Sequence, residues 1–463
     1  MNEFDLLLRD GLIVYPARGT AGGSIGVRDG RIAAVLAPGE NARAHRVIDC
    51  AGRWIMPGAI DAHTHYGFGV PDDDFRTETR FAAMGGTTMA LSFFRSKDLL
   101  SQFPAELARS RTQSFVDFSY HFGITEHAHV AMLPRCMEDF GVSSYKLYLM
   151  YKGSAGLAKG FTEIDDSLLF AAMEQVARMP GAVLSVHCEN TEVVPFLRQK
   201  AMEAGLQGLR AWDAQSPDFL EAENVHRACY FARITGCPIN IVHLSSRAGL
   251  SEVRRHRNEG GRAILHVETC PHYLSLTQQD GCGELAKVNP PVRTEADVDA
   301  LWEGIVEGIV DTVGSDHVSR KRSTKEGGIW KASAGFPGTG LILPVLIDQG
   351  HFRRGIPIET IAAVTSLNVA RLYNIPGKGD IVPGLDADFA VIDPARRWVV
   401  DPSKLHSYSD YSPYEGRSLA GWPDLTILRG RVVMEQGELL GGAGQGSFVE
   451  RRPRAGHGIR ANG

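Results

Sequence analysis

The sequence predicts an α/β protein built around a (β/α)8 TIM-like barrel, with a second, small β-sandwich domain made from both ends of the chain. Two observations support this prediction. Eight short strand-like segments alternate with amphipathic stretches across residues 53–375, and both flanking segments show the rhythm of β-structure. The expected domains are therefore 53–375 for the barrel, and 1–52 together with 376–463 for the composite domain and a C-terminal tail.

The first segment alternates apolar residues with Gly and Asp turns, which is typical of short strands. The expected strands are 5–8, 11–15, 23–27, 31–35 and 46–49. The same rhythm returns in 379–384, 388–392 and 425–433, so we expect the two ends to assemble one domain. The tail from Gly441 is rich in Gly and Arg, and we expect a solvated extension or a subunit contact.

The barrel strands are expected as short apolar runs near 55–62, 86–93, 117–124, 145–150, 182–188, 239–244, 263–268 and 311–315. Amphipathic stretches such as 166–178, 219–235 and 298–307 lie between them and predict the covering helices. Eight strands with intervening helices favour a barrel over an open doubly wound sheet. The alternative, a dinucleotide-binding sheet, needs a glycine-rich turn after its first strand, and the sequence has none there.

Charge and composition exclude several classes of protein. The 463 residues carry 49 Lys and Arg against 54 Asp and Glu, with no basic stripe, so we expect no nucleic-acid partner. No stretch approaches the roughly 18 apolar residues of a membrane helix, and the N-terminus does not resemble a signal peptide. The seven cysteines are scattered within apolar runs, which is typical of buried thiols in a reducing compartment. We therefore expect a cytoplasmic protein without a membrane partner.

The most informative motif is Asp61-Ala-His63-Thr-His65, which closes the first expected barrel strand. Side chains two residues apart on an extended strand point the same way. His63 and His65 can therefore present two imidazoles to one divalent ion, and neutral imidazole is the commonest ligand of zinc-like metals. Taken alone, such a pair is more often a chance surface feature than a metal site.

Further polar residues lie on or at the ends of other expected strands. Each one by itself has an ordinary structural explanation, such as a satisfied core histidine or a helix N-cap. Barrel enzymes, however, place their active sites at the carboxyl ends of the strands. Four histidines, one lysine and one aspartate on one rim therefore indicate an active site; they are His63, His65, Lys146, His187, His243 and Asp316.

Six more motifs accompany these residues: Asp-Asp-Phe at 73–75, Ala-Met-Gly-Gly-Thr-Thr at 83–88, Glu-Thr-Cys-Pro-His-Tyr at 268–273, Asn-Pro-Pro-Val-Arg at 289–293, Gly-Leu-Asp-Ala-Asp-Phe at 384–389 and Ser-Pro-Tyr-Glu-Gly at 412–416. With them the sequence resembles the amidohydrolase superfamily along nearly its whole length. Within that superfamily it is similar to the cyclic amidases, which include dihydropyrimidinase, hydantoinase, allantoinase and dihydroorotase.

The resemblance implies two divalent ions per subunit, with zinc as the expected metal. The two histidines of the first strand and Asp316 would bind one ion, and His187 and His243 would bind the other. Lys146, carboxylated on its amine to N6-carboxylysine, would bridge the pair. An ammonium group cannot ligate a cation, whereas a carbamate supplies two anionic oxygens.

The resemblance also implies the chemistry, in which a metal-bridged hydroxide opens the ring of a small cyclic amide or imide. Asp316 would carry the proton from the water to the leaving ring nitrogen. Tyr151 resembles the tyrosine that hydrogen-bonds the tetrahedral oxyanion in dihydropyrimidinases and hydantoinases, and Asn289 is expected to bind the amide edge of the substrate. The family further implies a homo-oligomer, with a tetramer as the expected state.

Departures from the family pattern reduce the range of expected substrates. Dihydroorotases usually carry an arginine two residues after the second histidine, where this chain has Gly67. The flanking Tyr66 and Phe68 would instead cover apolar surface, so we expect a neutral ring with an exocyclic group. The remaining sources of positive charge in neighbouring loops are Arg95, Lys97 and Lys152.

Three functions remain open at this point. Tyr151 favours a hydantoinase-like or dihydropyrimidinase-like enzyme, whereas the segments 187–190 and 412–414 look more like allantoinase, so ureide hydrolysis is the main alternative. Some relatives keep the fold, lose the metals and serve as assembly scaffolds. Those relatives lose the ligand set, which this chain retains, and the scaffold alternative is therefore the weakest.

Overall fold

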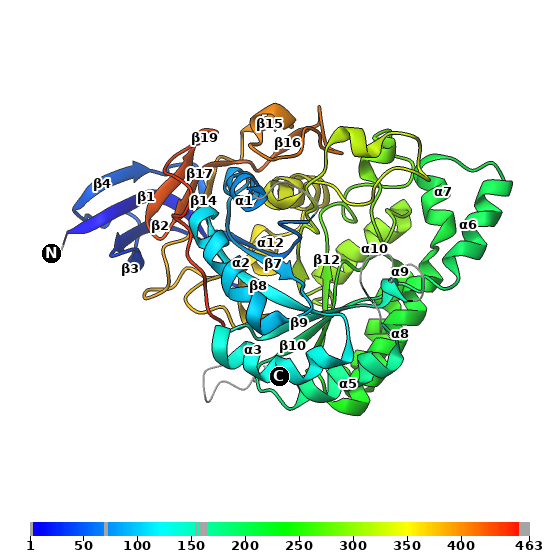
Figure 1. Ribbon diagram of the computed structural model, residues 1–463. Helices are drawn as coiled ribbons and strands as arrows, with labels where there is room; N and C mark the ends of the chain where they lie inside the picture. Colours follow the sequence, from blue (N-terminus) through cyan, green and yellow to red (C-terminus); the bar gives the residue numbers. More distant parts are fainter. Residues whose placement is uncertain (1–2, 69–72, 153–155, 157–160, 162–163, 453–463) are drawn as a thin grey trace.

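The computed structural model describes residues 3–68, 73–152, 156, 161 and 164–452. Two large sheets organise these residues (Figure 1). One has eight strands in chain order, and the other has nine strands drawn from both ends of the chain. The predicted fold class, an α/β barrel with a separate sheet domain, is confirmed.

The barrel strands lie close to the predicted positions and pair in parallel with their neighbours. They are β6 (Ala59–Thr64), β7 (Thr87–Phe94), β8 (Asp117–Ile124), β9 (Ser144–Tyr148), β10 (Val183–His187), β11 (Ile239–Ile241), β12 (Leu265–Thr269) and β13 (Thr312–Val313). The two ends of this sheet meet just beyond β13. There, the backbone N–H of His65 donates to the carbonyl of His317 at 2.9 Å, and that of His317 donates to His63 at 3.2 Å. The first and last strands of the barrel are thereby joined at the end that carries the polar residues.

Helices follow the strands and cover the barrel. They are α1 (Asp74–Met84), α2 (Leu99–Gln113), α3 (His127–Phe140), α5 (Asp166–Ala177), α6 (Val194–Glu203), α7 (Gly208–Gln215), α8 (Asp218–Thr235), α9 (Arg247–His256), α10 (Glu295–Val306), α11 (Ile342–Leu346), α12 (Ile358–Ala362) and α13 (Asn368–Leu372). Local signals start several of them. The Asp98 carboxylate accepts from two backbone N–H groups of α2, and Thr294 and Asp297 form a reciprocal capping box on α10.

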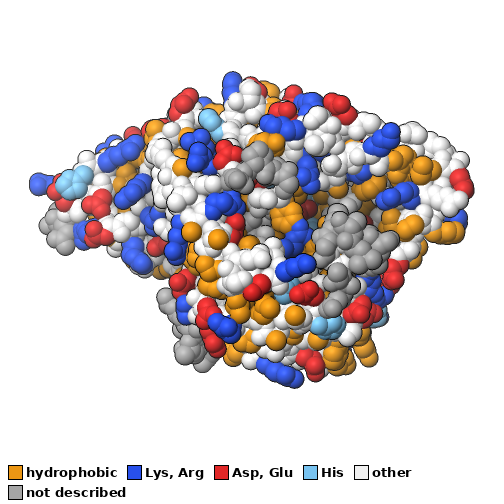
Figure 2. All heavy atoms as spheres, viewed as in Figure 1, with side chains coloured by type: hydrophobic (Ala, Val, Ile, Leu, Met, Phe, Trp, Pro, Cys, Tyr) orange, Lys and Arg blue, Asp and Glu red, His pale blue; other side chains and the backbone are white. Residues whose placement is uncertain are grey.

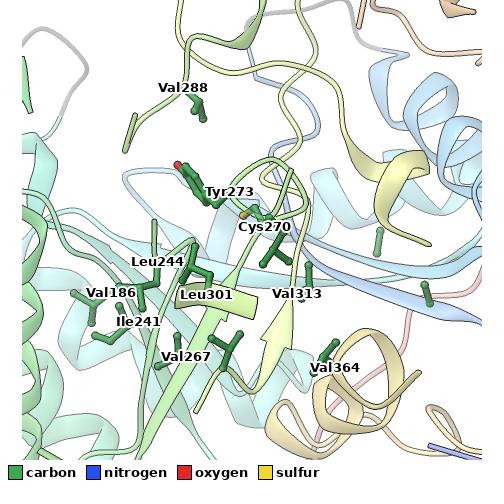
Figure 3. Packing of buried hydrophobic residues seen from close by; sticks show 14 of the residues in the cluster. Val186, Ile241, Leu244, Val267, Cys270, Tyr273, Val288, Leu301, Val313 and Val364 are labelled. Atoms are coloured by element: carbon green, nitrogen blue, oxygen red, sulfur yellow. The ribbon is translucent and has the colours of Figure 1, made fainter. Parts of the chain in front are cut away.

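Apolar side chains from successive strands are buried together with helix residues such as Leu301 of α10. Figure 3 shows Val186, Ile241 and Val267 among the buried residues of this cluster. The sequence reads as nearly continuous apolar runs here because strands of a parallel sheet are covered on both faces. The functional histidines follow directly, since His187 comes one residue after Val186 and His243 two residues after Ile241.

The nine-stranded sheet combines strands from the N-terminal and C-terminal segments of the chain (Figure 1). Its strands are β1 (Phe4–Tyr15), β2 (Gly19–Arg28), β3 (Arg31–Leu36), β4 (Ala44–Asp49), β5 (Trp54–Pro57), β14 (Phe389–Ile392), β17 (Pro423–Leu428), β18 (Arg431–Glu435) and β19 (Glu438–Leu439). β5 pairs in parallel with β1 and antiparallel with β14, which links the N-terminal strands to the C-terminal ones. A separate antiparallel pair consists of β15 (Arg397–Val399) and β16 (Ser418–Ala420).

Several expected strands differ from the structure. The expected strands 5–8 and 11–15 form the single strand β1, and the expected strand 425–433 is divided between β17 and β18. The run near 55–62 is two strands, β5 in the terminal sheet and β6 in the barrel, and the change falls at Gly58, where a Cβ would lie 2.2 Å from Thr88 Oγ1. The segment 379–384 forms no strand, because Gly379 and Gly384 adopt left-handed φ values of 93° and 95°. The division of the chain at residues 53 and 375 stays a prediction.

The tail packs against the barrel, so our expectation of a solvated extension is wrong for its segment around Arg451. Arg451 is fully buried, and its guanidinium donates to Ser119 Oγ at 2.9 Å and to Ser144 Oγ at 2.8 Å. Phe448 forms a β-bridge with Phe118 of β8. An arginine fixed by hydroxyl groups is a tertiary feature that composition does not reveal. The tail beyond Arg452 lies outside the described residues.

The cysteines, the surface charges and the helices agree with what the composition predicts. All seven cysteines are free, and six of them are buried, with Cys282 partly exposed. Acidic and basic side chains are interspersed on the face seen in Figure 2. Within the described ranges, none of the helices is long and apolar enough to cross a lipid bilayer.

Candidate metal centre

All eight predicted site residues line one cavity of about 340 Å³ at the carboxyl ends of the barrel strands. They are His63, His65, Lys146, Tyr151, His187, His243, Asn289 and Asp316. The parallel barrel explains this convergence, because residues that close different strands meet at one rim. The roles that these residues play stay predictions.

His63, His65 and Asp316 form the tightest group of possible metal ligands at this rim. Their donor atoms lie within 4.8 Å of one another, and Asp316 Oδ1 lies 3.1 Å from the Nε2 atom of each imidazole. Although burial alone would raise it, the two imidazoles hold the pKa of Asp316 well below its usual range. A carboxylate between two imidazoles is a suitable arrangement for a divalent cation.

His187 and His243 form an adjoining pair, with ring centroids 4.3 Å apart. The Nδ1 atom of His243 is buried and makes no hydrogen bond with the described part of the chain. His243 and Asp316 both have left-handed backbones, with φ values of 41° and 50°. Non-glycine residues in that region are strained and cluster at functional sites, where the surrounding structure holds them in place.

Lys146 lies in the middle of β9 and is almost completely buried. Its Nζ atom has no hydrogen-bond partner among the described residues, and it lies 4.9 Å from the ring centroid of Phe93 and 5.4 Å from that of Tyr148. Burial lowers the pKa of Lys146 to about 8, although Glu268 and Asp316 oppose the shift. A buried amine without an acceptor is costly unless another group completes the site.

The buried histidines are mainly in the form that binds metal. Burial lowers the pKa of His65 to about 3, and it also lowers the pKa of His187 and, strongly, that of His243. These imidazoles are therefore neutral near pH 7. His63 differs, because Glu268 and Asp316 raise its pKa although burial and Lys146 act in the opposite direction.

Two buried carboxylates that sequence reasoning missed hold the outer nitrogens of the imidazoles. Glu268 Oε1 lies 2.5 Å from His63 Nδ1, and Glu189 Oε2 lies 3.2 Å from His187 Nε2. Glu189 also accepts a hydrogen bond from Ser216 Oγ at 2.6 Å. Such partners fix the orientation and tautomer of a ligating ring. Glu268 lies in the motif at 268–273 and Glu189 in the segment 187–190, but no spacing rule predicts which histidine each one meets.

Tyr151 and Asn289 form part of the cavity wall from outside the strands. Tyr151 ends the short helix η1 (Leu149–Tyr151), and its ring stacks on Phe161 at a centroid distance of 4.3 Å. Trp212 Nε1 donates to Asn289 Oδ1 at 3.1 Å. Because an indole nitrogen can only donate, this bond orients the amide and leaves its NH2 group available as a donor.

Of the three possible sources of positive charge in the loops, only Arg95 lines the cavity. Lys152 pairs with Asp166 at 3.2 Å, and Lys97 is exposed. The structure adds a second guanidinium, that of Arg320, which sequence reasoning did not single out. Phe68 lines the cavity as well.

Known proteins resemble this chain over most of its length. The model of the amidohydrolase family matches residues 150–433. The chain is 36% identical over 471 residues to an allantoinase of Rubrobacter xylanophilus, a match that covers 99% of this chain and 100% of that protein. The solved structure of an L-hydantoinase (dihydropyrimidinase) from Arthrobacter aurescens matches with a TM-score of 0.89 and 30% identity over 96% of this chain and 99% of the other. A dihydropyrimidinase from Brevibacillus agri matches with a TM-score of 0.87 and 28% identity over 96% and 98%.

Proposed function

This chain belongs to the amidohydrolase family, and on that premise we propose that it opens the ring of five- or six-membered cyclic amides and imides, as hydantoinases and dihydropyrimidinases do. It is a metal-dependent hydrolase that acts on carbon–nitrogen bonds. Its small-molecule substrate binds in the cavity at the carboxyl ends of the barrel strands.

One observation carries the proposal, namely a set of buried metal-binding groups that have no other partner. His243 Nδ1 and Lys146 Nζ are buried without a hydrogen-bond partner in the described structure, and the buried His63 Nε2 faces Asp316, which belongs to the same proposed ligand set. Unpaired buried polar atoms cost free energy, and their gathering around one cavity supports an ion site there. The residues therefore fit the metals that the family uses.

We assign the two ions as the family resemblance implies. His63, His65 and Asp316 would hold one ion, His187 and His243 would hold the other, and carboxylated Lys146 would supply oxygens to both. Neutral imidazoles with a few carboxylate oxygens favour zinc among the common divalent metals. Divalent ions held by these residues would supply Lewis acidity toward the scissile carbonyl and would lower the pKa of a bound water molecule.

The side chains of the protein then position the substrate and move protons. The Asp316 carboxylate accepts the proton of the attacking water and delivers it to the ring nitrogen as the carbon–nitrogen bond breaks. The Tyr151 hydroxyl donates to the oxyanion that forms on the carbonyl oxygen when the carbonyl carbon is attacked. Asn289, held by Trp212, binds the amide edge of the ring. By the same resemblance we propose a homo-oligomer, with a tetramer as the expected state.

The substrate class is tested by incubating purified protein, prepared without chelator and with bicarbonate, with three rings. These are a 5-substituted hydantoin, dihydrouracil and allantoin, and ring opening is followed by chromatography. We expect the hydantoin or dihydrouracil to give its N-carbamoyl product at the highest kcat/KM. Failure to open any of the three rings, in protein that contains metal, would refute the proposed function.

Allantoin is the second candidate substrate, because the chain is 36% identical to an allantoinase over its full length. A kcat/KM for allantoin about tenfold or more above that for the hydantoin would select this alternative. The ring-opening chemistry and the assigned residues would stay the same.

Replacing Tyr151 with Phe removes one proposed oxyanion donor and should lower kcat by about 10²–10³-fold. Tyr148→Phe is the matched comparison, because the Tyr148 hydroxyl is buried in the same cavity and has no partner among the described residues. Steady-state kinetics of both variants with one hydantoin decide the assignment. A silent Tyr151→Phe variant together with an impaired Tyr148→Phe variant would transfer the role to Tyr148.

A further inference from the structure

We propose that the ring opened by this enzyme carries an anionic exocyclic group, a carboxylate on a short chain, and that Arg95 and Arg320 bind it at the cavity wall. The inference rests on the proposed function, since it names the substituent of the same substrate. It replaces our expectation of a neutral ring, which was based on Gly67 and on the apolar surface of its neighbours Tyr66 and Phe68.

The guanidinium of Arg95 stacks on aromatic rings, and no carboxylate of the described chain neutralises its charge. It follows β7, and its Cζ atom lies 3.9 Å from the ring centroid of Phe68, 5.0 Å from that of Phe161 and 5.4 Å from that of Tyr148. Nowhere in the described chain does its side chain meet a carboxylate or a hydrogen-bond acceptor. Stacking engages the faces of a guanidinium and leaves the N–H groups in its plane free to bind an anion.

The position of Arg95 depends on a glycine in the neighbouring strand. A Cβ at Gly123 of β8 would lie 2.6 Å from Arg95 Cγ and 3.2 Å from its Cδ. Any other residue at position 123 would therefore displace the stem of the arginine. The absence of a side chain there, together with the three surrounding rings, preorganises the guanidinium at the cavity wall.

Arg320 supplies the second guanidinium, from the loop that follows β13. Its backbone N–H donates to Ser409 Oγ at 3.0 Å, which ties the loop to the C-terminal segment. Its Nε atom is buried without a partner among the described residues. Two buried amines of this region, Lys287 and Lys325, donate to backbone carbonyls, as in the 2.8 Å bond from Lys325 Nζ to Ser333 O. Neither of them offers Arg320 an anion.

The two arginines on the cavity wall have no carboxylate partner there. Among the described lining residues, Asp316 carries the one carboxylate, and it is already engaged by His63 and His65. Arg95 and Arg320 therefore have no anion of their own. A ligand carboxylate would satisfy the free N–H groups of the arginines through charge-assisted hydrogen bonds, which are among the strongest that a protein makes.

The distance of Arg95 from the metal ligands sets the size of the substituent. The ring of Phe68 lies 5.5 Å from that of His65, and the Arg95 guanidinium stacks on Phe68. The carboxylate therefore lies about one aromatic ring away from the proposed metal ligands, which fits one or two methylene groups between the reacting ring and the anion. Hydantoin-5-acetate and hydantoin-5-propionate are probes of this chemistry.

The test compares kcat/KM for hydantoin-5-acetate with that for its uncharged isostere, hydantoin-5-acetamide. We expect the wild-type enzyme to prefer the acid by about tenfold or more, since a hydrogen bond to a charged group contributes about 10- to 100-fold. Arg95→Met and Arg320→Met should each lower the acid-to-amide ratio by about tenfold, mainly by slowing the acid. Lys97→Met, at an exposed position outside the cavity, is the control and should leave the ratio unchanged.

The outcomes are separable from those of the proposed function. If wild-type enzyme opens the amide as well as the acid, or better, the anionic substituent is refuted while the ring-opening activity stands. If the arginine variants slow both substrates equally, the guanidinium groups act on the ring or the product, which also refutes the inference. If neither probe is opened while one of the three rings of the screen is, the anionic substituent is refuted; if none of these rings is opened although the protein contains metal, the proposed function itself fails. The acid-to-amide ratio of kcat/KM in the wild-type enzyme tests the anionic substituent even if a variant does not fold.

Discussion

Asp316→Asn should abolish ring opening while leaving the fold intact. The amide can still offer an oxygen to a cation, but it cannot accept a proton from water and return it to the leaving nitrogen. Proton transfer by a positioned side chain contributes about 10²–10⁴-fold, so the loss should lie in kcat and reach at least that range. Steady-state kinetics with the best substrate of the ring screen measure it.

The backbone at Asp316 makes asparagine the mildest replacement. With φ at 50°, the residue is in the left-handed region, which asparagine tolerates better than other non-glycine residues. The two side chains have nearly the same volume, so the 8% exposed site need not repack. We therefore expect a circular dichroism spectrum and a metal content close to those of the wild type.

A control separates the chemistry from a general effect of removing a carboxylate. Asp139→Asn changes an exposed residue of α3 that pairs with Arg135 one turn away, far from the lining of the cavity. Its kcat should match that of the wild type, because exposed helical ion pairs contribute little. An Asp316→Asn variant with normal turnover would show that another group carries the proton.

The barrel and the strand-end residues could be predicted from the sequence because both depend on local patterns. Apolar runs bounded by turns give the strands, and the parallel topology then places His187 and His243 at one rim without any knowledge of tertiary contacts. The shortest barrel strand, β13, has only two residues. The order of the strands nevertheless predicts a rim position for Asp316, and Asp316 lines the cavity.

The rest of the site depends on contacts between distant segments, which no local pattern encodes. Glu268 meets His63 across 205 residues, and Arg451 reaches Ser119 across 332 residues. Arg320 belongs to a loop whose course is set by Ser409 and by buried lysines, so its place on the cavity wall follows only from the fold. Sequence reasoning therefore locates the candidate metal ligands at the rim better than it locates the candidate specificity residues.

Lys146→Ala should remove both the activity and much of the bound metal. In the wild type, prepared without chelator, we expect elemental analysis to approach about two equivalents of divalent ion per subunit. Alanine deletes the only group proposed to bridge the ions, and each ion is then left with ligands on one side. Because metal binding and folding are coupled, the variant should also melt at a lower temperature when metal is added to both proteins.

Chemical rescue distinguishes a bridging carbamate from an ordinary buried lysine. The Lys146 amine has no partner among the described residues, so its removal leaves a space beside the proposed ligands that a small carboxylic acid can enter. Acetate or propionate, at concentrations that leave the wild type unaffected, should restore part of the metal content and turnover, because their two oxygens replace those of the carbamate.

Lys200→Ala, at an exposed position of α6, is the control and should neither lose metal nor respond to acetate. Full metal content and normal turnover in Lys146→Ala would remove the bridge from the model. A loss of activity with two ions still bound would instead make Lys146 a group that acts on the substrate.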